Sequence, residues 1–180
     1  MFRILSFALL LGLTGCSDRP KAPALTPSPI LTNTRGAFRL TVPSDWRLLS
    51  RGELPPGKLE QTRTIASYSR TDGDSPAGFQ VSAVDAAPLT AVVEMLTNDR
   101  TEGTAVWRSH AAEEAVEAGG VKGTRVRLHS GTGKEKGAHI RDIYVFERGD
   151  LIWMFGGIYA PTDSQARDAV RRAVDSLEWK

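Results

Sequence analysis

Two histidines flank a glycine-rich segment in the second half of the chain. His129 precedes residues 131–137, and His139 follows them. If segments 121–129 and 139–147 pair as a hairpin, strand alternation places both imidazoles on one face near the turn. Neighbouring imidazoles are suitable ligands for a divalent transition metal.

A metal site needs more ligands than this pair supplies. Glu135 lies in the glycine-rich segment and Asp142 follows His139, but alternation turns Asp142 towards the opposite face of the predicted hairpin. Only two nitrogen ligands are then assured, fewer than structural or catalytic metal sites use. We therefore predict no metal and no cofactor.

Ser130 is the nearest candidate nucleophile for a hydrolase. A serine nucleophile needs a base within hydrogen-bonding reach of its hydroxyl. Ser130 directly follows His129, and adjacent side chains of a strand point to opposite faces. The chain has no G-x-S-x-G motif, and the glycine-rich segment matches no nucleotide-binding pattern. These observations predict that the protein is not an enzyme.

The predicted hairpin also carries a stripe of basic side chains. Alternation predicts that one face combines Arg125, Arg127, His129, His139 and Arg141. Like charges on neighbouring strands destabilise a sheet unless acidic groups neutralise them. Those groups are either glutamates of this chain, namely Glu113, Glu114, Glu117 or Glu147, or acidic groups of a protein partner or lipid. We call these five residues the basic stripe, the predicted partner-binding surface.

The only cysteine of the chain follows an apolar N-terminal run. Arg3 provides a basic start, and residues 4–13 carry no charge. A run of this length is typical of a signal peptide, because crossing a bilayer takes about 20 residues. The tetrad Leu13-Thr14-Gly15-Cys16 resembles the bacterial lipobox. This resemblance implies a lipoprotein signal peptide at 1–15, and a diacylglycerol and further acyl chains such as palmitate on Cys16.

A proline-rich segment separates the cysteine from the rest of the chain. Residues 16–36 contain four of the ten prolines and show no hydrophobic periodicity, which predicts an extended tether. The protein is then expected outside the cytoplasm, lipid-anchored to a bacterial membrane. That membrane is the outer membrane in a diderm cell and the plasma membrane, at its outer face, in a monoderm cell.

Composition and charge indicate that the remaining residues, 37–180, form one globular domain. The 180 residues are 41% hydrophobic and 24% charged, with a net charge of +2. Four of the 23 basic residues and one of the 21 acidic residues precede residue 37. The domain therefore carries 19 basic and 20 acidic residues, a net charge of about −1. A near-neutral domain predicts no nucleic-acid partner, and we expect it to be monomeric. A lone cysteine excludes an internal disulfide.

Hydrophobic periodicity predicts mostly strands with two helices. We expect strands at 38–42, 46–49, 62–69, 79–85, 105–108, 140–146 and 151–159, and within 116–129, where Gly119-Gly120 interrupts the strand structure. The run at 151–159 is apolar at nearly every position, as in a central strand buried on both faces. Apolar stripes predict helices beginning after Pro88 and after Thr162, the latter with a Thr162-x-x-Gln165 capping box. Hairpin-linked strands with few helices predict an α+β domain with a mainly antiparallel sheet.

The order of these motifs resembles the PsbP family. The likeness rests on Val42-Pro43-Ser44-Asp45-Trp46, on Gly120-Val121-Lys122-Gly123 before a strand, and on the ending Asp175-Ser176-Leu177-Glu178-Trp179. The resemblance spans residues 37–180 and implies an α/β/α sandwich. That family comprises PsbP, Ran-binding Mog, DcrB-type and LpqN-type proteins, mostly binding or assembly modules. The chain is thus expected to bind a protein partner without catalysis, or alternatively to carry an apolar or lipid ligand between helix and sheet.

Overall fold

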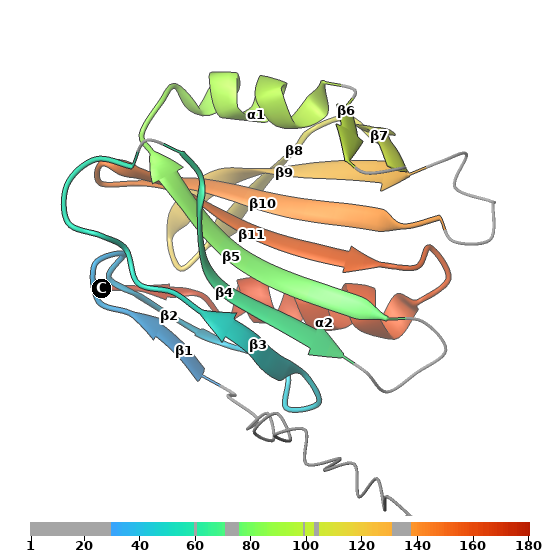
Figure 1. Ribbon diagram of the computed structural model, residues 1–180, viewed down its shortest axis with the longest axis horizontal. Helices are drawn as coiled ribbons and strands as arrows, with labels where there is room; N and C mark the ends of the chain where they lie inside the picture. The colour runs from blue at the N-terminus through green and yellow to red at the C-terminus, as the bar shows by residue number, and fades with distance from the viewer. Residues whose placement is uncertain (1–29, 60, 71–75, 99, 103–104, 131–137) are drawn as a thin grey trace, which may run out of the picture.

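The computed structural model describes residues 30–59, 61–70, 76–98, 100–102, 105–130 and 138–180. In this part of the chain a mainly antiparallel sheet is combined with two helices, so the predicted α+β class is confirmed (Figure 1). Cys16, the residues before it and the glycine-rich segment 131–137 lie outside the described residues.

The large sheet has nine strands, and every pair in it is antiparallel. Eight of them follow the order β3-β4-β5-β11-β10-β9-β7-β6, and β8 pairs with β9 beside that path. The strands are β3 (Arg47–Arg51), β4 (Arg63–Arg70), β5 (Ala77–Asp85), β6 (Arg100–Glu102), β7 (Ala105–Ser109), β8 (Glu114–Ala118), β9 (Val121–Ser130), β10 (Ile140–Arg148) and β11 (Leu151–Tyr159). The predicted central strand is confirmed, since β11 lies between β5 and β10 and is buried along most of its length.

A second, smaller sheet consists of β1 (Ile30–Asn33), β2 (Phe38–Thr41) and β12 (Glu178–Trp179), in the order β1-β2-β12. The predicted tether at 16–36 is therefore too long, because residues 30–33 pair with β2 and Leu31 is buried. The sequence of this strand, Ile30-Leu31-Thr32-Asn33, does not alternate between apolar and polar residues, so periodicity does not predict it.

Helix α2 (Ser164–Asp175) packs on one face of the large sheet, together with the small sheet. The buried side chains Ala166, Val170 and Ala173 form its inner stripe. Aromatic rings fill the space beside it: Phe38 of β2 contacts Trp153 and Phe155 of β11, and Trp179 contacts both phenylalanines. This side of the large sheet thus has a helix and three short strands, more than the single helical layer of an α/β/α sandwich.

Helix α1 (Leu89–Thr97) lies on the other face. Its Val92, Val93 and Leu96 pack with residues of β9, β10 and β11 to form a separate core cluster. The helix has only nine residues and contacts β9 and β10, which leaves the same face of β4 and β5 without a helix over it. None of the described helices is long and apolar enough to span a membrane.

The pairing register of β9 and β10 differs from the predicted one by one residue. His129 lies opposite Ile140, Arg127 opposite Asp142, and Arg125 opposite Tyr144. Alternation within each strand is as predicted, but a one-residue shift between strands exchanges the faces of one strand relative to the other. Asp142 therefore shares a face with Arg125 and Arg127, and Arg141 does not.

Candidate functional site

The predicted basic stripe is divided between the two faces of the sheet. Arg125, Arg127 and His129 lie on the face that carries α2, whereas Arg141 lies on the face that carries α1. His139 directly precedes Ile140, the residue opposite His129, so the two histidines do not share a face. The prediction that all five residues share one face is therefore wrong.

The residues that the structure describes contain no group of three or more potential metal ligands. A different histidine lies near His129: the ring of His110, after β7, meets it edge-on with 5.4 Å between ring centroids. Sequence reasoning missed His110, because no local spacing relates it to β9. The Ser130 hydroxyl accepts a hydrogen bond from the backbone N–H of His139, at 2.9 Å, and has a structural role in the hairpin.

Arg125 and Arg127 are paired within the chain by the fully buried carboxylate of Asp142. Arg127 donates through Nε to Oδ1 at 2.7 Å, and Arg125 donates to Oδ2 at 2.8 Å. The Tyr159 hydroxyl, from β11, also donates to Oδ2. Glu114 of β8 accepts a further hydrogen bond from Arg125 at 2.9 Å. Of the glutamates considered from the sequence, Glu114 is thus one internal partner of the arginines. Asp142 was not expected to be a partner, because the predicted register placed it on the opposite face of the sheet.

This cluster shifts the pKa values of its members in opposite directions. Burial alone raises the pKa of Asp142, but hydrogen bonds from Arg127, Arg125 and Tyr159 outweigh it and hold that pKa below its ordinary value. Burial and the hydrogen bond to Asp142 raise the pKa of Tyr159. Burial raises the pKa of Tyr144, beside Arg125, to about 12. The carboxylate is therefore ionised and both phenols are neutral near pH 7, an arrangement that stabilises the sheet.

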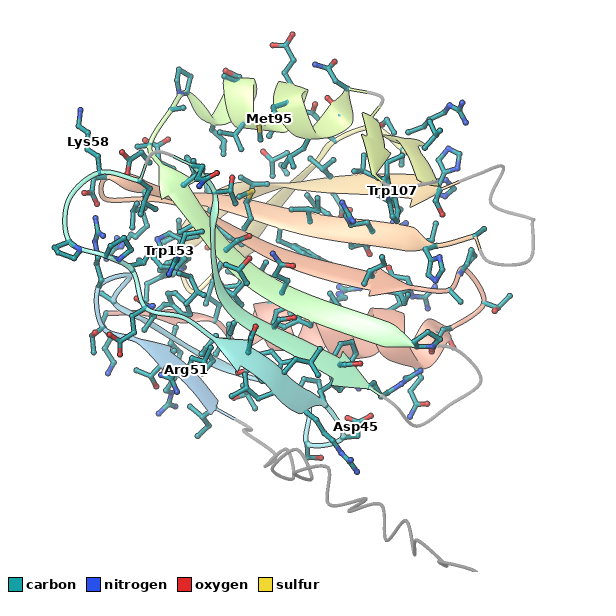
Figure 2. The ribbon with its side chains drawn as sticks, in the orientation of Figure 1. Asp45, Arg51, Lys58, Met95, Trp107 and Trp153 are labelled. Carbon is teal, nitrogen blue, oxygen red and sulfur yellow. The ribbon has the colours of Figure 1, made fainter. Side chains whose placement is uncertain are left out.

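A groove lies on the opposite face of the sheet, beside α1. Its volume is about 480 Å³, within the range of small-molecule sites. Its lining residues come from α1, β4, β5, β10 and β11 and from the segment before β4: Thr62, Ser67, Tyr68, Gly78, Phe79, Gln80, Ser82, Met95, Leu96, Arg141, Ile143, Met154, Gly156 and Ile158. Met95 and Leu96 form the edge on α1, where Met95 is half exposed (Figure 2).

Two glycines form part of the floor of the groove. Gly78 of β5 and Gly156 of β11 lie on the groove side and supply no side chain. A Cβ atom built on Gly156 would make only ordinary van der Waals contacts, at 3.9 Å to the Asp142 carbonyl oxygen and to Ile143, so that position has room for a small side chain. A Cβ atom on Gly78 would come within 3.0 Å of Ile158, so that position is tighter. Glycine within a strand is the one sequence signal that could have indicated this site, and it does not reveal which face of the sheet carries the groove.

Arg141 stands at the groove and is held by an aromatic ring. Its guanidinium carbon lies 4.2 Å from the centroid of the Trp107 ring, a cation–π contact. Trp107 is itself buried in the core cluster under α1 (Figure 2). The groove therefore combines an apolar wall, a floor with hydroxyl and amide groups, and one fixed cation.

Comparison with known proteins identifies the fold. No protein-family model and no curated protein matches this sequence. Among solved structures, cyanobacterial PsbP (CyanoP) from Synechocystis has a TM-score of 0.55 at 10% identity, covering 88% of this chain and 95% of its own. LpqN of Mycobacterium tuberculosis, described as involved in cell envelope biogenesis, has a TM-score of 0.50 at 14% identity, covering 78% of this chain and 82% of its own. At these identities the likeness shows the fold alone: this chain has a PsbP-like α+β fold.

Proposed function

We propose that this protein is a non-catalytic, extracytoplasmic binding module, anchored to a bacterial membrane by lipid on Cys16, and that it holds a small amphiphilic molecule between α1 and the sheet. The groove of about 480 Å³ carries this proposal. The envelope role stated for the structurally similar LpqN supports the location, and the lipobox-like tetrad ending at Cys16 supports the anchor.

The chemistry of the groove favours an elongated ligand with an apolar part. Met95, Leu96, Met154 and Ile158 present aliphatic and thioether groups, and Ser67, Gln80 and Ser82 offer hydrogen bonds. Methionine side chains are flexible and polarisable, so they adapt to apolar ligands of irregular shape. A few polar groups within an apolar lining are typical of sites that orient a small molecule.

The arginines on the α2 face give weaker support to the alternative, in which the basic stripe captures an acidic protein partner. Both guanidiniums already donate to Asp142, and Arg125 also donates to Glu114. An acidic partner would have to compete with a buried, charge-assisted arrangement. A protein partner at the stripe stays a prediction.

Photocrosslinking in membranes tests the groove. The full lipoprotein is exposed to a long-chain alcohol carrying a diazirine at the chain end, and the modified peptides are mapped by mass spectrometry. We expect labels on α1 and β11. Gly156→Leu fills the open position on β11, so it should abolish those labels while leaving the melting temperature within a few degrees.

Leu49→Ala is the matched control, because Leu49 is an exposed apolar side chain on β3, outside the groove. Its labelling should equal that of the wild type. Labels scattered over the surface, or labels on α1 and β11 that persist in Gly156→Leu, would contradict the proposed function.

A further inference from the structure

We propose that the groove selects elongated, rigid molecules that carry hydroxyl groups along one long side and hydrocarbon along the other, as polyhydroxylated fused-ring compounds do. This inference rests on the proposed function and specifies its ligand class. It follows from the strand register beneath the groove, from the position of α1 and from the hydrogen-bonding groups of β5.

The floor of the groove changes polarity from one strand to the next. In one row of the register, Ile143 of β10 lies opposite Gly156 of β11, which lies opposite Gln80 of β5. In a neighbouring row, Met154 of β11 lies opposite Ser82 of β5. Both rows therefore pass from apolar to polar at the same place, between β11 and β5.

Along each of these two strands the polarity is nearly constant. The lining residues of β11 are Met154, Gly156 and Ile158, and none of them has a polar side chain. Met154 and Ile158 are four residues apart, about 13 Å along the strand. The boundary between the apolar and the polar lining thus runs parallel to the strands. A ligand with one polar long side matches this boundary better than a ligand with a polar head and an apolar tail.

Helix α1 stands on the apolar side of the boundary. It contacts β9 and β10 and has no such contact with β4 or β5 (Figure 1). Met95 and Leu96 of α1 face the groove. The hydrocarbon side of a ligand gains most from burial against these side chains, whereas its hydroxyl side can lie over β5 and remain partly hydrated.

The polar side chains of β5 are suited to hydroxyl groups. A serine hydroxyl both donates and accepts, and a glutamine amide has two N–H donors and a carbonyl acceptor. Gln80 donates to the hydroxyl of Thr64 at 3.0 Å, which orients its amide. Gln80 and Ser82 are two residues apart, about 7 Å along β5. Hydroxyls spaced along a rigid skeleton can therefore reach both, and a rigid ligand loses less entropy on binding.

Two uncharged competitors test the inference. Both are steroid triols of the same formula: one carries all three hydroxyls on one face of the ring system, and the other divides them between the two faces. Each is titrated against the diazirine alcohol on the full lipoprotein, and the concentration that halves the labels on α1 and β11 is measured. Because neither isomer is charged, Arg141 does not distinguish them.

We expect the one-faced triol to compete at about tenfold lower concentration than the divided triol, because the divided triol has to place a hydroxyl against the apolar side. In the double variant Gln80→Leu/Ser82→Ala the two isomers should become equal. Ser164→Ala/Gln165→Leu is the matched control, since it makes the same two changes at exposed positions of α2, outside the groove. It should retain the preference of the wild type.

The melting temperature shows whether Gln80→Leu/Ser82→Ala stays folded. Should that variant unfold, Gln80→Leu alone changes an exposed side chain and should still reduce the preference for the one-faced triol. A preference that persists unchanged in the folded variant would overturn the inference.

The remaining outcomes separate the inference from the proposed function. Equal competition by both isomers in the wild type, stronger competition by the divided triol, or competition by neither overturns the selection and leaves the groove as the site of the diazirine alcohol. No labelling of the groove by that alcohol, with or without competitor, overturns the proposed function itself.

Discussion

Asp142 connects three strands through one carboxylate. Its oxygens accept from Arg125 and Arg127 on β9 and from Tyr159 on β11, while Asp142 itself belongs to β10. An ionised group without exposed surface is costly unless every lone pair is satisfied. A one-residue slip of either neighbouring strand would leave this charge unpaired, so the cluster stabilises the register that the hairpin pattern alone left open.

We predict that Asp142→Asn lowers the free energy of unfolding by about 3–5 kcal/mol at pH 7, because two guanidiniums lose a buried partner. Urea denaturation measures the loss. Asp175→Asn is the matched control: Asp175 is an exposed partner of Arg171 at 3.6 Å, and its loss should change the free energy by less than about 0.5 kcal/mol.

The lowered pKa of Asp142 adds a pH dependence to this prediction. The unfolded carboxyl has a pKa of about 3.9, whereas folding lowers the pKa of Asp142. The contribution of Asp142 to the free energy of unfolding is therefore complete above about pH 4, and it is lost as pH falls through the pKa of the folded state. Unfolding curves from pH 6 to pH 2 should show the wild type and Asp142→Asn converging at low pH. Curves that stay parallel would refute the contribution of this carboxylate.

Two adjacent glycines of β11 face different surroundings. Gly156 opens onto the groove, whereas a Cβ atom on Gly157 would overlap Val170 of α2. We predict that Gly157→Ala lowers the free energy of unfolding by about 1–3 kcal/mol, because α2 has to shift. Gly156→Ala should be neutral or stabilising by up to about 1 kcal/mol, since it only restricts the unfolded chain. Thermal unfolding of both variants measures this, and equal losses would place Gly156 against packed atoms instead of a groove.

At the scale of elements, one aspartate both begins α2 and binds β4. The Asp163 side chain accepts from the backbone N–H of Ala166 at 2.9 Å and pairs with Arg70, whose side chain is 4% exposed. The sequence predicted Thr162 as the N-cap. Ser, Thr and Asp are all good caps, so local preference does not choose between Thr162 and Asp163, and Arg70 from a distant strand favours the aspartate.

We predict that Asp163→Ser keeps the cap and still lowers the free energy of unfolding by about 3 kcal/mol, because Arg70 is left buried without its carboxylate. Adding Arg70→Met should recover most of the loss by removing the stranded charge. Chemical denaturation of the single and double variants tests this, and a double variant as unstable as the single one would show that the unpaired charge of Arg70 does not cause the loss.

Elements with a long periodic pattern could be predicted from the sequence, and their pairing could not. The apolar run of β11 and the inner stripe of α2 both lie where periodicity placed them. The strands β1, β6 and β12 have two to four residues and, unlike the equally short β2, show no alternation of apolar and polar side chains. The faces of the basic stripe followed from a register that alternation within single strands does not determine. The groove depends on where α1 ends over the sheet, which is a tertiary property.

At the scale of the whole molecule, the described chain begins at β1, on the side away from α1 (Figure 1). The proposed anchor at Cys16 precedes it along the chain. We predict that a clickable palmitate analogue labels the wild type in its bacterial host and fails to label Cys16→Ser. Ser17→Ala keeps the thiol and should label like the wild type. Label retained in Cys16→Ser would show that the acyl group is attached elsewhere.

The residues of β11 alternate between two different surroundings, so mutations on its two faces have different consequences. Trp153, Phe155 and Tyr159 pack or bond on the α2 face, whereas Met154, Gly156 and Ile158 line the groove. Since neighbouring residues of a strand point apart, substitutions on the groove side leave the aromatic core untouched. Descendants of one ancestor can therefore exchange one ligand for another by single mutations while inheriting the same folding stability.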